Sequence, residues 1–125
     1  MRTILITGAS GGLAQEMVKL LPNDQLILLG RNKEKLAQLY GNHPHVELIE
    51  IDITDDSALE ALVADLYLRY GKIDVLINNA GYGIFEDFDQ ISDQDIHQMF
   101  EVNTFALMNL SRRFAERMKE SRKGH

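Results

Sequence analysis

The sequence predicts an α/β fold, a doubly wound parallel sheet with helices on both faces. Short runs of apolar, β-forming residues alternate along the 125 residues with longer stretches in which apolar residues recur every three or four positions. This alternation is typical of βαβ units. A glycine-rich stretch also lies between the first run and the first helical stretch, where such a fold makes a tight turn. We therefore expect one domain over residues 1–125.

The first two predicted strands flank the first helix. Residues 3–6 form a strand, and the helix after the glycines ends before Pro22, because proline has no N–H for a helix interior. Residues 25–29 are almost wholly apolar, as in a strand that is buried on both faces. The inner face of the first helix is predicted to hold Leu13, Met17, Leu20 and Leu21.

The second and third helices follow the same pattern. Asn32 is expected to cap the second helix, whose inner face would hold Leu36, Leu39 and Tyr40. Residues 46–51 are the third predicted strand and residues 73–77 the fourth. The helix between them is expected to end at Gly71 and to bury Leu59, Leu62, Val63, Leu66 and Tyr70.

A single long helix is predicted from Ser92 onward, with Ser92 as its N-cap and acidic residues in its first turn. Its apolar stripe consists of Ile96, Met99, Phe100, Asn103, Leu107, Leu110, Phe114 and Met118. Four strands joined by right-handed crossovers make half of a doubly wound sheet.

Composition and charge exclude several classes of function. The absence of cysteine excludes disulfide scaffolds, thiolate metal sites and cysteine nucleophiles, and no metal site is predicted. The apolar runs are too short for membrane spans, so we expect a cytoplasmic protein with no membrane partner. The net charge of −6 is concentrated between residues 50 and 101, which disfavours nucleic acid as a partner. Two interpretations, the solvated face of a helix and a phosphate-binding stripe, fit Arg112, Arg113, Arg117, Lys119, Arg122 and Lys123.

The strongest chemical signal is the stretch at positions 7–14, Thr-Gly-Ala-Ser-Gly-Gly-Leu-Ala. Glycines permit a tight turn and a close approach of the backbone, and the free N–H groups at a helix start hold a pyrophosphate. A plain flexible turn is the alternative, and the position between a strand and a helix disfavours it. The residues that this loop would offer are Gly8, Ser10, Gly11, Gly12 and Leu13.

Two further segments follow strand ends. After the second strand comes Gly30-Arg31-Asn32, with no carboxylate for an adenosine ribose. Gly30 leaves room, and the planar donors of Arg31 suit a 2′-phosphate, which favours NADP over NAD. The alternative interpretation of Arg31 is an exposed charge at the start of a helix. Asp52 ends the third strand and suits either the edge of an adenine or a turn.

Asparagines carry the last two signals. Asn78 and Asn79 precede Ala80 and Gly81 after the fourth strand, a position that also suits a purely structural turn. Asn103 lies on the apolar stripe of the long helix, where an unpaired buried amide costs about 1–3 kcal/mol. It is therefore expected either to join a core network or to line a site.

In this order and spacing, the motifs resemble those of the short-chain dehydrogenase/reductase family, whose cofactor loop is Thr-Gly-x-x-x-Gly-x-Gly; here Ala14 replaces the last glycine. The resemblance implies a Rossmann-type fold. Asn103 aligns with the asparagine of the family's catalytic tetrad, which holds a water of the proton relay. The resemblance also implies that the dinucleotide is bound by Gly8, Ser10, Gly11, Gly12, Leu13, Arg31, Asn32, Asp52, Ile53, Asn79, Ala80 and Gly81.

One part of the family's machinery is absent from the sequence. A Tyr-x-x-x-Lys pair polarises the substrate oxygen in the family, and none of the four tyrosines here has a lysine four positions later. We therefore expect a Rossmann-type sheet truncated after the fourth strand and the long helix that follows it, the N-terminal half of a family member. The pocket for a carbonyl or alcohol substrate would belong to the other half, and this chain alone would be inactive.

Two functions remain open. The chain is either the cofactor half of an NADP-dependent oxidoreductase that transfers hydride between nicotinamide and a carbonyl/alcohol substrate, or a catalytically inactive dinucleotide-binding or interaction module. A truncated product without function of its own is a third interpretation. We also expect a homo-oligomer, because the fourth strand would be an unpaired sheet edge and the stripe of the long helix would lack neighbours. In the family, that helix packs at a subunit interface.

Overall fold

The computed structural model of the chain describes residues 1–79, 92–122 and 124–125, and the side chains of residues 98–100 and 102–104 also lie outside this description. Within it, one parallel sheet has the strand order β3-β2-β1-β4. The strands are β1 (Thr3–Ile6), β2 (Gln25–Gly30), β3 (Val46–Glu50) and β4 (Val75–Ile77). The predicted α/β fold is confirmed, with a shorter fourth strand.

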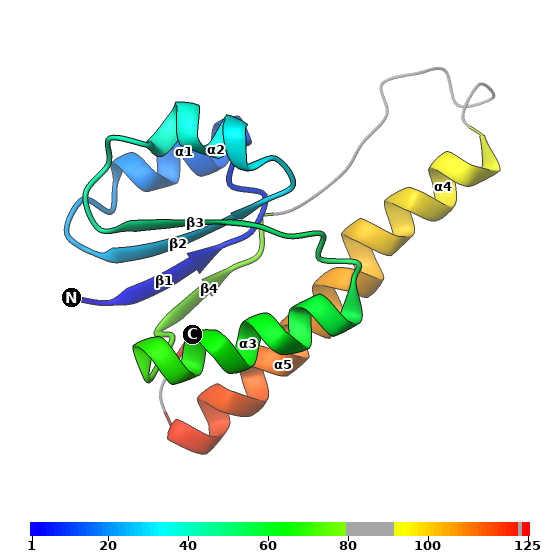
Figure 1. Cartoon of the computed structure of the whole chain (residues 1–125). Coiled ribbons are helices and arrows are strands. Elements are labelled where there is room, and N and C mark those ends of the chain that lie inside the picture. Colours follow the sequence, from blue (N-terminus) through cyan, green and yellow to red (C-terminus); the bar gives the residue numbers. More distant parts are fainter. Residues whose placement is uncertain (80–91, 123) are drawn as a thin grey trace.

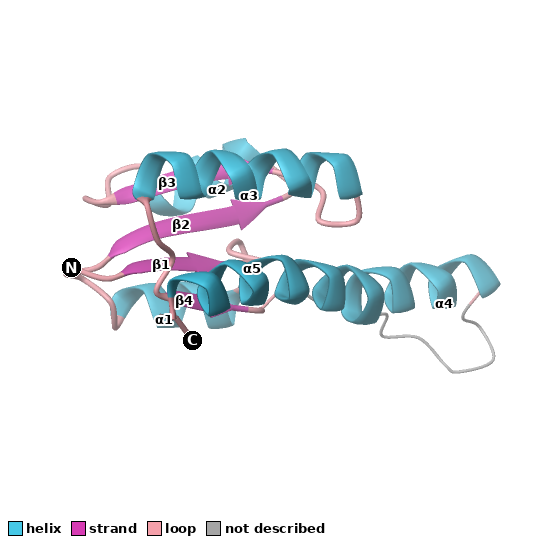
Figure 2. Ribbon diagram, turned by 90° about the horizontal axis from the view of Figure 1, so that it is seen from below, coloured by secondary structure: helices cyan, strands magenta, loops and turns pink. Residues whose placement is uncertain are grey.

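Helices cover both faces of the sheet (Figure 1). On one face lie α1 (Gly12–Lys19) and α2 (Lys33–Tyr40). On the other lie α3 (Asp56–Tyr70) and α5 (Leu107–Ser121). Ahead of α5 come α4 (Asp93–Phe100) and the π-helical segment η2 (Glu101–Ala106). Figure 2 shows α4 extending past the carboxyl ends of the strands.

Alternation along the strands divides the core into two layers. Leu5 of β1 faces α3 and α5, whereas its neighbours Ile4 and Ile6 face α1 and α2. All three side chains are fully or almost fully buried, and each such burial contributes about 1.5–3 kcal/mol. Both faces of the central strands are therefore apolar, which explains the continuous apolar runs in the sequence.

The predicted inner face of the first helix is partly wrong. Leu13 and Leu20 are 66% and 79% exposed, and the buried residues of α1 are Ala14 and Val18. These two are four positions apart and share one side of the helix, and the small Ala14 permits close packing on the sheet. Leu39, which was predicted on the inner face of α2, is also exposed. The buried set predicted for α3 is confirmed, with Tyr70 half-buried.

The predicted helix caps are confirmed. The Asn32 side chain accepts a hydrogen bond from the Lys35 N–H, and Ser92 Oγ accepts one from the Asp95 N–H at 3.1 Å. Gly71 closes α3 with a φ of 79°, in the region that favours glycine. No helix in the described part of the chain is long and apolar enough to cross a membrane.

The long helix differs from prediction because η2 interrupts its α-helical spacing. A π-helix takes more residues per turn, so side chains after it are rotated relative to a continuous α-helical stripe. Leu110 and Phe114 are fully buried against the α3 side of the core, which corrects the expectation that the stripe lacks neighbours. Phe105 and Met108 are instead 61% and 63% exposed.

The outer edge of β4 is also partly paired, which corrects the expectation of an unpaired edge. The His125 N–H donates to the Asp74 carbonyl and the Leu76 N–H donates to the His125 carbonyl, each at 2.8 Å. This is the hydrogen-bond pattern of a parallel ladder. Glycine is needed at position 124 for this pairing for two reasons. Its φ of 124° lies in the region that favours glycine, and a Cβ there would collide with the Met118 side chain.

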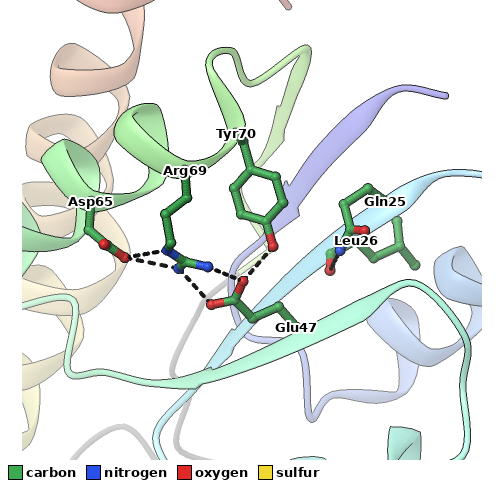
Figure 3. Close-up of polar contacts among 6 residues, drawn as sticks. All are labelled: Gln25, Leu26, Glu47, Asp65, Arg69 and Tyr70. Atoms are coloured by element: carbon green, nitrogen blue, oxygen red, sulfur yellow. Dashed lines mark hydrogen bonds and ion pairs between the residues drawn. The ribbon is translucent and has the colours of Figure 1, made fainter.

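A polar cluster ties the outer strand β3 to α3 (Figure 3). The Arg69 guanidinium donates to both Glu47 oxygens at 2.7 Å and to Asp65 at 2.9 Å, and the Tyr70 hydroxyl also donates to Glu47. The hydrogen bonds from Arg69 hold the pKa of Glu47 below its ordinary value. Burial and the Glu47 carboxylate raise the pKa of Tyr70 to about 12, so Tyr70 remains a donor at neutral pH.

Arg69→Gln tests the contribution of this cluster to stability. We expect the free energy of unfolding at pH 7 to fall only modestly, because the bidentate pair is partly exposed and solvent screens it. The folded-state pKa of Glu47 lies below its unfolded value of about 4.3, so the stabilisation is present above that pH and is lost as the pH falls through the folded-state value. Urea denaturation should therefore show a difference between wild type and variant at pH 7 that shrinks as the pH is lowered below the unfolded-state value of about 4.3.

Lys19→Gln is the matched control, since it removes the exposed ion pair with Glu16 on α1. It should change the free energy of unfolding by less than about 0.5 kcal/mol. An equal loss in both variants, or a loss in Arg69→Gln that does not depend on pH, would show that the Glu47 pair does not stabilise the fold.

Candidate functional site

The carboxyl ends of the parallel strands bring most of the predicted site residues to one edge of the sheet (Figure 1). Positions 7–13 follow β1, positions 30–32 end and follow β2, positions 52–53 follow β3, and positions 78–79 follow β4. In open α/β sheets this edge is where ligands bind. The candidate site is therefore built from four segments that are far apart in the sequence.

The glycine loop between β1 and α1 adopts a conformation that uses its glycines. Gly8 has a φ of 60°, a left-handed backbone conformation that suits glycine. Gly11 is the N-cap of α1 and, having no side chain, leaves the cap hydrogen bond unmade. The Gly11 N–H instead donates back to the Gly8 carbonyl at 3.2 Å and closes the turn.

The loop is held from the α2 side through Ala9. The Ala9 N–H donates to the Leu29 carbonyl of β2 at 2.9 Å, and the Tyr40 hydroxyl donates to the Ala9 carbonyl at 2.5 Å. Tyr40 is only 6% exposed, and burial raises its pKa above the ordinary value, so the hydroxyl stays protonated and can donate. Both backbone groups of Ala9 are thereby satisfied inside the protein.

The loop is held from the β4 side through Asn79. Its side-chain amide donates to the Gly8 carbonyl at 3.1 Å, and its backbone N–H donates to Thr7 Oγ1 at 3.0 Å. The Thr7 N–H donates to the Ile77 carbonyl at 3.1 Å and continues the pairing of β1 with β4. Asn78 points to α5, where its amide donates to Ser111 Oγ at 2.9 Å.

The outer side of the loop is open. A Cβ built on Gly12 meets no described atom within 4 Å, and Gly11, Gly12 and Leu13 are exposed. The first N–H groups of a helix have no partner within the helix, and here no side chain caps them. Together with the helix dipole, these groups favour an anion at this place. The arrangement fits the pyrophosphate of a dinucleotide.

A cavity of about 390 Å³ lies at the ends of β2 and β3, and its lining is Arg31, Glu50, Ile51, Asp52 and Ala58. Arg31 is exposed, and no described carboxylate lies within ion-pair distance of its guanidinium. It acts on Asp52 by charge alone, lowering the pKa of that carboxyl. Arg31 is therefore free to bind an anion here.

Gly30 is needed for the packing of α2, in addition to the room for a ligand that the sequence predicts. A Cβ at this position would lie 3.0 Å from Leu36 Cδ1, because the Leu36 side chain of α2 packs directly against it. The missing side chain therefore makes room for α2. The Leu36 side chain itself is fully buried.

Asp52 lies in a turn, which is one of the two roles left open for it, and its contact with an adenine stays a prediction. Its Oδ1 accepts hydrogen bonds from the Thr54 hydroxyl at 2.6 Å and the Thr54 N–H at 2.9 Å. These bonds are the main cause of the lowered pKa of Asp52. Ile53 is buried in the core between the sheet and α3, so only its backbone is left for a ligand.

Three predicted residues are not placed in the site. Ala80 and Gly81 lie outside the described residues. Asn103 lies in η2, and its side chain is outside the description. Single π-helical turns occur frequently at functional sites. In the described part of the chain, no group of three or more His, Cys, Asp or Glu side chains is arranged to hold a metal ion.

Sequence reasoning missed two residues of this region. The sequence predicts Tyr40 on the inner face of the second helix. Because a buried tyrosine needs a hydrogen-bond partner, this placement was a signal that its hydroxyl contacts another group. Glu50 was not singled out, yet its Oε1 accepts the Lys33 N–H at the start of α2 at 3.0 Å. A glutamate at the end of a strand carries no signal of this contact in the sequence.

Curated relatives match most of this chain. An uncharacterized oxidoreductase of Schizosaccharomyces pombe is 31% identical over 98% of the chain and 41% of its own length. A benzil reductase of Saccharomyces cerevisiae is 35% identical over 87% of the chain and 46% of its own length. The chain thus spans about half the length of these relatives or less.

Solved structures agree with the fold over the same extent. A short-chain dehydrogenase from Streptomyces avermitilis matches 98% of the chain and 46% of its own, with a TM-score of 0.84 and 30% identity. A serine dehydrogenase from Escherichia coli matches 98% of the chain and 59% of its own, with a TM-score of 0.85 and 26% identity. The sequence model of the short chain dehydrogenase family matches residues 2–125. The chain therefore belongs to the short-chain dehydrogenase family, and it corresponds to the N-terminal half of that family's fold.

Proposed function

We propose that this chain is the cofactor-binding half of an NADP-dependent oxidoreductase that transfers hydride between nicotinamide and a carbonyl/alcohol substrate. When bound, the dinucleotide supplies the hydride at its nicotinamide ring. The chain's own residues hold the rest of the cofactor: the glycine loop and the start of α1 hold the pyrophosphate, and Arg31 and Asn32 flank the adenosine ribose. Asn79, Ala80 and Gly81 would lie beside the cofactor, and Asn103 would belong to the proton relay of the complete enzyme.

One observation carries the proposal. The exposed start of α1 has no side-chain cap, and a Cβ on Gly12 would stand in open space. A loop selected only for folding would gain roughly a few tenths of a kcal/mol from a side-chain cap in place of Gly11. An anionic ligand would use the same N–H groups, which explains why they are left open.

The preference for NADP rests on Arg31. Its guanidinium lines the cavity at the ends of β2 and β3 without an ion-pair partner among the described residues, and a planar fork of donors matches a phosphate. NADPH differs from NADH in the 2′-phosphate alone, so a comparison of the two isolates this contact.

We expect NADPH to bind more tightly than NADH, and Arg31→Ala to weaken NADPH binding by about tenfold while NADH binding changes little. Dissociation constants from cofactor fluorescence titration measure this. Lys33→Ala is the control, because it removes one positive charge nearby from a residue that is not among those lining the cavity. Equal affinities of wild type for both cofactors would refute the assigned role of Arg31.

A second function, an inactive dinucleotide-binding module, is favoured by one observation. The sequence contains no Tyr-x-x-x-Lys pair, so the chain lacks the acid that would protonate a substrate oxygen. Both functions use the same cofactor site. They differ in whether this chain works together with a second half.

We expect the purified 125-residue chain to show no turnover of simple ketones with NADPH, since hydride transfer without a positioned acid is slow. Loss of NADPH absorbance over hours at high protein concentration is the measurement. A full-length short-chain reductase assayed in parallel is the positive control. Turnover above the rate without protein would contradict the proposed inactivity.

The proposed substrate partner is a small carbonyl or alcohol compound, and the proposed protein partner is a second copy of the chain. Phe105 and Met108 present exposed apolar surface on η2 and α5, and such surface favours association. We also propose a cytoplasmic location, which is the expectation from the short apolar runs of the sequence.

Self-association should appear as a dimer or larger species in light scattering at micromolar concentration. Phe105→Ser combined with Met108→Ser should shift the protein toward the monomer, because both side chains are already exposed and their replacement spares the core. Leu20→Ser, on the exposed side of α1, is the control. A wild-type protein that remains monomeric would contradict this part of the proposal.

A further inference from the structure

The cavity that Arg31 lines is also lined by two acidic residues. Its lining includes Arg31, Glu50 and Asp52. The Asp52 carboxylate is held in its turn by Thr54. No described residue close to Glu50 in the sequence bonds its carboxylate in this way, so the position of Glu50 depends on contacts with other elements.

The ladder between β2 and β3 places Glu50 beside the segment that carries Arg31. Gly30 and Glu50 are register partners in this parallel pair, and the Ile51 N–H donates to the Gly30 carbonyl at 2.9 Å. Neighbouring strands are about 4.8 Å apart. Gly30, the residue directly before Arg31, therefore lies next to Glu50, and Arg31 and Glu50 line the same cavity.

Glu50 also occupies the place of an anion at the start of α2. Its Oε1 accepts the Lys33 N–H at 3.0 Å, and Lys33 is the first residue of that helix. Carboxylates and phosphates compete for such N–H groups, because the positive end of the helix dipole favours both. A ligand phosphate entering this cavity would meet a carboxylate that already holds one of the donors.

We propose that Glu50 is a second determinant of cofactor choice, whose carboxylate opposes Arg31 and weakens the binding of a 2′-phosphate in this cavity. This inference rests on the proposed function, since it presumes that the cavity receives the adenosine ribose. Arg31 attracts the 2′-phosphate and Glu50 repels it. The chain therefore discriminates between NADPH and NADH less than Arg31 alone would allow.

Glu50→Gln separates charge from structure. The amide oxygen of glutamine can still accept the Lys33 N–H, so the start of α2 keeps its partner while the negative charge is lost. We expect NADPH to bind about three- to tenfold more tightly than to wild type, the effect of one unit charge several ångströms from a phosphate near a protein surface. NADH, which has no 2′-phosphate, should change by less than about twofold. The gain should shrink in about 0.5 M salt, because ions screen the repulsion.

Two further variants make the experiment specific. Glu34→Gln removes the same charge from the first turn of α2 but does not line the cavity, so its ratio of NADPH to NADH affinity should stay at the wild-type value. Glu50→Ala removes the acceptor as well as the charge. Fluorescence titration with NADPH and NADH, together with urea denaturation of each variant, measures all three.

The outcomes distinguish this inference from the proposed function. If Arg31→Ala lowers the affinity ratio and Glu50→Gln leaves it unchanged, Glu50 only supports the helix, and this inference is overturned while the proposed function stands. Equal changes in Glu34→Gln and Glu50→Gln would also overturn it, because the effect would not belong to the cavity. If wild type binds neither cofactor, the proposed function fails and this inference fails with it. A selective, salt-sensitive gain for NADPH in Glu50→Gln supports it.

Discussion

The hydrogen bonds that hold the glycine loop between β1 and α1 are the constraint on which the candidate site depends. Asn79 at the end of β4 fixes the Gly8 carbonyl, Leu29 of β2 fixes the Ala9 N–H, and Tyr40 of α2 fixes the Ala9 carbonyl. Three elements that are distant in the sequence thus set two consecutive peptide groups. With these groups satisfied inside the protein, the first turn of α1 is exposed and has no side-chain cap among the described residues, which is what an anion-binding loop requires. The loop has this form only when the sheet is assembled.

Helix α2 connects the two ends of the site. Its C-terminal residue, Tyr40, donates a hydrogen bond to the glycine loop. Its N-terminus lies at the cavity that Arg31 and Glu50 line. Leu36 lies between them and packs against Gly30 so closely that a side chain there would have to displace it. The eight residues of α2 therefore set the spacing between the glycine loop and the Arg31 cavity. A change in the packing of Leu36 would alter both ends together.

Local rules predicted the parts of the structure that depend on neighbours in the sequence. The strands, the caps at Asn32 and Ser92 and the turn at Gly71 follow from side-chain chemistry within a few residues. The parts that sequence did not predict depend on tertiary contacts. Examples are the bond from Tyr40 to Ala9, the use of Glu50 at the start of α2 and the pairing of His125 with β4. The buried face of α1 was predicted wrongly because the spacing of Leu13 and Leu20 fits one apolar side of a helix. The small Ala14 makes the contact with the sheet instead.

The central claim is that the glycine loop and the Arg31 cavity together bind one dinucleotide. The most direct test is a titration of the isotope-labelled chain with NADPH, followed by NMR of the backbone amides. Our account predicts that the largest shifts fall on Gly8, Gly11, Gly12, Leu13, Arg31, Asn32 and Asn79. It also predicts that Gly12→Val, whose side chain enters open space in the free protein, stays folded and loses these shifts. Shifts of equal size across the surface, or binding that Gly12→Val leaves intact, would contradict the claim.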